Sequence, residues 1–145
     1  MSQKRFWWSV AAVWFVMMVT DYLLHGIWLM PLYQQTAQFW RPAEEMQKYM
    51  PWMWLGHACF AWAFVWIYSK GISRANQWGQ AFRFAWAIIL VGKVPGQLMM
   101  WATTPYPAEL IAKWFVVAMI QAMAAAFVMT WTYKPLMVVK ERKAA

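Results

Sequence analysis

The fold class that this sequence predicts is an all-α integral membrane protein, a four-helix antiparallel (up-down) bundle. Of its 145 residues, 63% are hydrophobic and only 12% are charged, whereas about a quarter of a soluble domain is charged. Apolar runs recur along the chain at close to the roughly 20 residues that a membrane-spanning helix needs. The 14 tryptophans agree with this class, because Trp favours the boundary between water and hydrocarbon.

Four spans are expected within a single transmembrane domain, 1–145. They cover residues 6–30, 52–68, 82–102 and 108–133. Short connections between successive spans indicate antiparallel neighbours. The first loop is longer: Pro42 suits a first helical turn, and Glu44 and Glu45 suit a helix N-terminus. We therefore expect a short interfacial helix here, lying on the membrane surface and ending at Pro51.

The last span has a clear beginning and a face of small side chains. Pro107 followed by Glu109 indicates a helix start. Ala118, Ala122 and Ala126 then recur every four residues, which lets a neighbouring backbone approach closely. This stripe predicts close helix packing.

The positive charges predict the orientation. Nine lie on one side, in the N-terminus, the middle loop and the C-terminal tail: Lys4, Arg5, Lys70, Arg74, Arg83, Lys134, Lys140, Arg142 and Lys143. Three lie on the other side: Arg41, Lys48 and Lys113. Because Lys and Arg collect in cytoplasmic loops, both termini are expected in the cytoplasm of a bacterial cell, with the basic tail 134–145 near anionic lipid of its inner membrane.

The third span contains a lysine in the middle of its apolar run. A Lys at the centre of a membrane helix costs roughly 2.5 to 3.5 kcal/mol on insertion scales, so it usually faces a partner or a wet cavity. Two residues later, Pro95 leaves the carbonyl of Val91 without its donor and is expected to kink the helix. Lys93 and Gln97, four residues apart, share a face.

Other polar side chains lie within the apolar runs. The candidate ligand- or ion-binding residues are Asp21, His25, His57, Lys93, Gln97 and Gln121. A rise of 1.5 Å per residue puts most of them about 4 to 13 Å from the outer edge, and Gln121 nearer the midplane. They are therefore expected to gather in the outer half of the bundle.

Three interpretations of this cluster are open. It could be structural, with Asp21 and Lys93 in a buried ion pair. It could be a proton or ion site, because histidines titrate near neutral pH. It could also hold b-type haem between His25 and His57 on neighbouring helices, or copper, for which soft thioethers are suited. The methionines expected toward the outer face are Met30, Met46, Met50, Met53, Met99 and Met100.

Other classes of function lack a signal. The sequence has no Gly-rich phosphate loop, no CxxC and no HExxH, so no catalytic constellation is recognised. The net charge of +8 is distributed by loop, which predicts contact with the lipid bilayer and no nucleic acid partner. We expect a binding or transport-type protein or an accessory subunit of a larger membrane complex. Four helices are few for a transporter that acts alone, so a homodimer is a further alternative.

Three short motifs carry a family resemblance. They are His25-Gly26 followed by Leu29 and Tyr33, then Trp40-Arg41-Pro42, and Tyr133-Lys134-Pro135 after the last span. With these motifs the chain resembles a group of small bacterial inner-membrane proteins of unknown function. The resemblance implies the four-helix architecture and supplies no mechanism.

Overall fold

The computed structural model describes residues 3–71 and 76–133, and no β-strand occurs among them. The all-α prediction is therefore confirmed for this part of the chain. Arg74 of the middle loop and the basic tail 134–145 lie outside the described residues.

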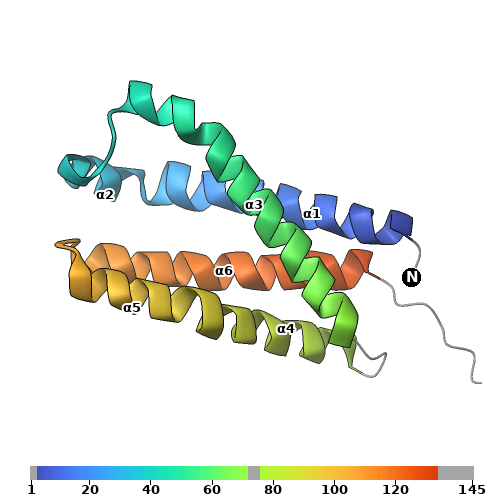
Figure 1. Cartoon of the computed structure of the whole chain (residues 1–145). Helices are drawn as coiled ribbons and strands as arrows, with labels where there is room; N and C mark the ends of the chain where they lie inside the picture. Colours follow the sequence, from blue (N-terminus) through green and yellow to red (C-terminus); the bar gives the residue numbers. More distant parts are fainter. Residues whose placement is uncertain (1–2, 72–75, 134–145) are drawn as a thin grey trace, which may run out of the picture.

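Figure 1 shows how the helices are arranged: α6 lies between α1 and the continuous α4–α5 segment, and α3 crosses α1 obliquely. The elements in chain order are α1 (Gln3–Asp21), η1 (Tyr22–Trp28), α2 (Met30–Gln35), η2 (Ala37–Phe39), α3 (Ala43–Gly71), α4 (Gln77–Ile88), η3 (Ile89–Lys93), α5 (Val94–Thr103) and α6 (Ala108–Thr132). Of these, η1 and η3 are π-helical, and η2 is a turn of 3₁₀-helix.

Two helices widen into π-helix near their polar residues. After Asp21, η1 continues α1, and the N–H of Leu29 donates to the carbonyl of Leu24 at 2.9 Å, five residues back. In the same way, η3 joins α4 to α5, and the N–H of Val94 donates to the carbonyl of Ile89. The disturbance expected near Pro95 thus takes the form of a wider turn just before the proline. Such π-bulges are frequent at functional sites.

The first loop differs from the predicted one. A helix does begin after Pro42, at Ala43, with Glu44 and Glu45 in its first turn. However, it does not end at Pro51 as a separate interfacial helix, because α3 continues through that proline to Gly71. An internal proline removes only one backbone hydrogen bond. The remaining hydrogen bonds on either side keep α3 a single helix. The short helix of the loop is instead α2.

The start of α4 depends on one asparagine and one glycine. Asn76 adopts the left-handed conformation, with φ of 52°, and its Oδ1 accepts a hydrogen bond from the N–H of Gly79 at 3.0 Å. A Cβ on Gly79 would lie 2.5 Å from the Asn76 side chain. Only glycine fits this cap, which starts the helix that leads to Lys93.

The core forms where small residues of α6 meet its neighbours. Ala118, Ala122 and Ala126 are buried, which confirms the predicted close packing of this stripe. They belong to a helix that packs against both α1 and α4. A second core region, at the other end of the bundle from the N-terminus, joins α2 to the beginning of α6 through Leu32 and Leu110.

Three helical segments are long and apolar enough to cross a membrane: Gln3–Trp28, Gln77–Thr103 and Ala108–Thr132. The predicted fourth span, 52–68, lies within α3, which is not among these candidates in the described part of the chain. Its apolar stretch contains His57 and four tryptophans, and these side chains lower the mean hydropathy of the segment.

Candidate functional site

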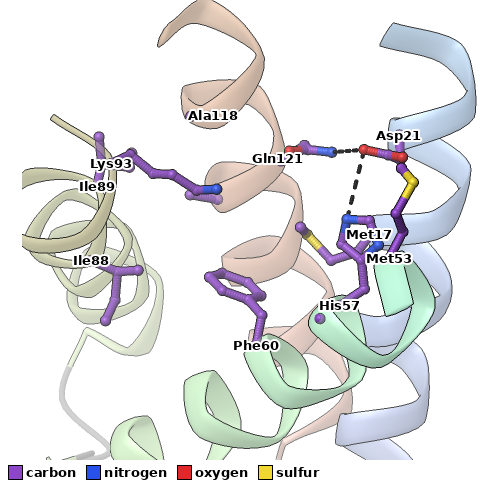
Figure 2. Close-up of a pocket in the computed structure, with 12 residues that line it drawn as sticks. Met17, Asp21, Met53, His57, Phe60, Ile88, Ile89, Lys93, Ala118 and Gln121 are labelled. Carbon is purple, nitrogen blue, oxygen red and sulfur yellow. Dashed lines mark hydrogen bonds and ion pairs between the residues drawn. The ribbon is translucent and has the colours of Figure 1, made fainter. Parts of the chain in front are cut away.

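A cavity of about 400 Å³ lies between α1, α3, η3 and α6. Its size is within the usual range for small-molecule sites, about 300 to 1,000 Å³. Figure 2 shows Asp21, His57 and Gln121 at one side and Lys93 reaching in from the other. The remaining lining is mostly apolar: Met17, Met53, Gly56, Phe60, Ile88, Ile89, Ala118 and Ala122. Four of the six predicted site residues therefore line one cavity.

The carboxylate of Asp21 is the centre of the acidic wall. Its Oδ1 accepts a hydrogen bond from Gln121 Nε2 at 3.3 Å, and the Nε2 atoms of His25 and His57 each lie 3.7 Å from it. These three groups come from α6, η1 and α3. Since Asp21 is 24% exposed, it is partly removed from solvent, and the surrounding groups stabilise its negative charge.

His25 lies beside the cavity and connects Asp21 to an outer layer of aromatic side chains. Its Nδ1 is within hydrogen-bond distance of the Tyr33 hydroxyl, which also accepts a hydrogen bond from Trp114 Nε1 at 2.8 Å. An indole N–H can only donate, so the hydroxyl proton of Tyr33 is available to His25 Nδ1. Neutral His25 then keeps its proton on Nε2, facing Asp21.

His57 differs from His25 in its second ring nitrogen. Its Nε2 faces Asp21, but its Nδ1 is buried and has no hydrogen-bond partner in the described structure. A bare ring nitrogen tolerates this environment better than an N–H group without an acceptor, because a buried unsatisfied donor is costly. The neutral imidazole of His57 therefore favours the tautomer with its proton on Nε2, facing Asp21.

Lys93 does not pair with Asp21 in the described structure, so the ion pair of the structural interpretation is not formed there. Within residues 3–71 and 76–133, the Lys93 ammonium has neither a hydrogen bond nor an ion pair. The reason is geometric: η3 carries Lys93 and the end of α1 carries Asp21 on opposite sides of the cavity, while two imidazoles and an amide already surround the carboxylate. Lys93, which is exposed in the described structure, therefore lines the cavity without a partner among the described residues.

Gln97 is separate from this site. It lines a second, apolar cavity of about 320 Å³ between α5 and α6, and its Oε1 is buried without a partner in the described structure. Gln97 was expected to share a face with Lys93, but no hydrogen bond joins the two side chains in the described structure. Four-residue spacing assumes a regular α-helix, and Pro95 interrupts that regularity between the two residues.

Sequence reasoning missed Tyr33 and Trp114 as parts of the polar network. Tyr33 enters the sequence analysis only as part of the motif that follows His25. Trp114 lies 81 residues from Tyr33 in the chain, so no local spacing connects the two. His25 and Tyr33 are eight residues apart, and their contact depends on the bend of the chain at Leu29. That bend is not evident from the sequence.

The haem and copper interpretations stay predictions. The Nε2 atoms of His25 and His57, which would have to face opposite sides of a haem iron, both point at Asp21 instead. Of the six outer methionines, Met53 alone lines the larger cavity among the described residues. No group of three or more His, Cys, Asp or Glu in the described part of the chain is arranged to hold a metal ion. Absorption spectra of oxidised and reduced protein test both interpretations directly.

The aromatic layer around Tyr33 closes the end of the molecule where α2 and the start of α6 meet. Trp40 and Trp114 pack edge to face with ring centroids 5.9 Å apart, and Tyr106 stacks on Trp40 at 5.6 Å. Burial raises the pKa of the Tyr33 hydroxyl above its ordinary value, with the hydrogen bond from Trp114 opposing the shift. Tyr33 therefore keeps its proton at neutral pH.

Comparisons with known proteins give no family for the chain. No protein-family model matches the sequence, and neither a similar curated protein nor a similar solved structure was found.

Proposed function

We propose that the chain is a small integral protein of the bacterial inner membrane, with four spans in an antiparallel bundle and both termini in the cytoplasm. Three long apolar helices support membrane insertion. The orientation rests on the loop charges, nine on the cytoplasmic side against three outside. In this arrangement Asp21 and Lys93 lie in the outer half of the membrane.

The fourth span in this proposal is the part of α3 that follows Pro51. Tryptophan lowers the mean hydropathy of a helix although it partitions well into the membrane interface. Trp52 and Trp54, which would lie near the outer boundary, are exposed on the surface of the chain. Placing α3 in the bilayer would provide these large apolar side chains with a lipid environment.

The cavity supports a binding or transport-type role, alone or as a subunit of a larger complex. The observation that carries this proposal is the unpaired Lys93 facing a cavity whose opposite wall holds Asp21. A charge within a membrane helix is costly and usually marks function. A purely structural role would bring the two charges together, whereas a binding site needs them apart with space between.

Thermal unfolding with small probes tests whether the cavity is a binding site. Benzoate, benzylamine and benzyl alcohol share one ring and differ in charge. We expect at least one of them to raise the unfolding temperature of the purified protein in mild detergent. Loss of that stabilisation in the Gly56→Leu variant would place the probe in the cavity.

The glycine variants make a matched pair. Gly56 lines the cavity, Gly96 does not, and a Cβ added at either meets nothing within 4 Å. Gly56→Leu should therefore fill the cavity without disturbing the fold, and Gly96→Leu should bind probe like the wild type. If none of the three probes stabilised the protein, or if both variants bound equally well, the cavity would not be a ligand site.

A further inference from the structure

The charges around the cavity favour a particular class of ligand. Among the described residues Lys93 has no partner, while Asp21 opposite accepts a hydrogen bond from Gln121 and lies 3.7 Å from the Nε2 atoms of both histidines. Between them the surface is mainly apolar, with Phe60 and Ile89 among the lining residues. A molecule with one anionic end and an apolar body matches both features, because its anion can pair with Lys93 while its body replaces water against the apolar wall.

We propose that the cavity binds a monocarboxylate with an apolar body and that one proton is taken up on His25 for each carboxylate bound. This inference rests on the proposed function, because it names the ligand of the same cavity. The proton comes from bulk water and ends on His25 Nδ1. The carboxylate stays ionised and pairs with the Lys93 ammonium.

Charge balance is the first argument for proton uptake. With both histidines neutral, Asp21 and Lys93 give the site a net charge of zero. An added carboxylate would leave a net negative charge, which is unfavourable within the proposed membrane span. A proton on His25 restores neutrality and adds a positive charge 3.7 Å from the Asp21 carboxylate.

Hydrogen-bond partners are the second argument, and they select His25 over His57. When His25 is doubly protonated, Nε2–H still faces Asp21, and Nδ1–H can donate to the Tyr33 oxygen, which changes from donor to acceptor. Oxygen has two lone pairs, so it can keep the hydrogen bond from Trp114 as well. His57 has no such partner for its buried Nδ1.

The other groups that face His25 agree with this assignment. Asp21 on α1 favours its positive charge, while His57 on α3 and Lys93 on η3 oppose it. Tyr33 on α2 contributes a neutral hydroxyl, and Trp114 on α6 contributes an indole N–H to that hydroxyl. A carboxylate paired with Lys93 would offset one of the two opposing charges, so binding and protonation favour each other.

Isothermal titration calorimetry with benzoate measures the coupling. The full chain in mild detergent is titrated near neutral pH in several buffers that differ in ionisation enthalpy. The dependence of the observed heat on that enthalpy gives the protons taken up per benzoate, and we expect about one where His25 starts neutral. In that range the affinity should fall about tenfold per pH unit as the pH rises.

Variants assign the roles. Lys93→Met should abolish benzoate binding, and Lys48→Met, at an exposed lysine of α3, should leave it unchanged. His25→Gln should weaken binding and remove the proton uptake. Tyr33→Phe removes the acceptor for the new N–H of His25 without changing the imidazole, so it should also reduce proton uptake. This variant tests the role of His25 even if His25→Gln fails to fold.

The outcomes separate the two proposals. Benzoate binding without proton uptake, or uptake that persists in both His25→Gln and Tyr33→Phe, would overturn the inference and leave the cavity a ligand site. Stabilisation by benzylamine or benzyl alcohol but not by benzoate would also overturn it and keep the proposed function. Binding of no probe at all would overturn both.

Discussion

The two charged sides of the cavity are built in opposite ways. Asp21 is surrounded by groups from three elements, whereas Lys93 extends from a widened turn with no partner in the described structure. Lys93 is exposed in the described structure, and within the proposed membrane span a charge without a partner is costly. The difference supports the proposal that the fold itself compensates Asp21, whereas a ligand of the cavity would compensate Lys93.

Removal of the Asp21 charge should have the largest effect on stability. Asp21→Asn leaves two imidazoles and an amide around a neutral side chain, and we expect a loss of about 2 kcal/mol in the free energy of unfolding. Denaturation by SDS in mixed micelles, followed by circular dichroism, measures it. Glu109→Gln, which breaks an exposed pair with Lys113, is the control and should cost less than about 1 kcal/mol.

Tyr33→Phe tests the connection between the acidic wall and the aromatic layer. It leaves Trp114 Nε1 and His25 Nδ1 without their shared partner, so we expect a loss of about 1.5 kcal/mol by the same measurement. Tyr106→Phe is a suitable control, because Tyr106 contributes ring packing to the same layer. Equal losses in both variants would show that the Tyr33 hydroxyl does not matter.

The raised pKa of Tyr33 predicts the behaviour of the protein in alkali. Its cause is burial, which disfavours the charged phenolate. The contribution to stability is therefore constant below about pH 10, where tyrosine in the unfolded chain is also protonated, and is lost as the pH rises further. Unfolding measured between neutral and alkaline pH should show a shallower loss in Tyr33→Phe, and an unchanged slope would contradict the prediction.

Substitution of Gln121, which is buried, and of Gln97, which is partly buried, should change stability less and in opposite directions. Gln121→Leu removes a hydrogen bond to Asp21 and should cost about 1 kcal/mol. Gln97→Leu replaces an amide whose buried Oε1 has no partner in the described structure, and it should leave stability unchanged or raise it. If Gln97→Leu were the more destabilising of the two, the Gln97 amide would make a stabilising hydrogen bond, and the prediction would be wrong.

Lys93→Met should have the smallest effect on folding although it removes a full charge. Since no protein group pairs with Lys93 in the described structure, the free energy of unfolding should stay within about 0.5 kcal/mol of the wild type or rise. A loss as large as that of Asp21→Asn would mean that Lys93 compensates Asp21 after all. The comparison between the two walls would then fail.

Much of the secondary structure could be predicted because its causes are local. Pro42 with Glu44, and Pro107 with Glu109, are signals within one helical turn, and both helices begin where they indicate. The predicted helix end at Pro51 is wrong, because a proline by itself does not reveal whether the segments on its two sides form one continuous helix. Pro95 predicts a kink in its helix, but it does not predict that the irregularity is a π-helical turn.

The sequence by itself determined that the chain is helical, that it has apolar runs long enough to cross a membrane, and that six polar side chains interrupt those runs. It predicted four spans, and three of the helices in the described residues are candidates by length and composition. Apolar run length, composition and first-turn chemistry suffice for this. Only the tertiary structure decided which of those side chains meet. Asp21 and His25 share a face through local spacing, but the rotation and crossing of separate helices put His57 and Gln121 beside Asp21 and left Lys93 across the cavity.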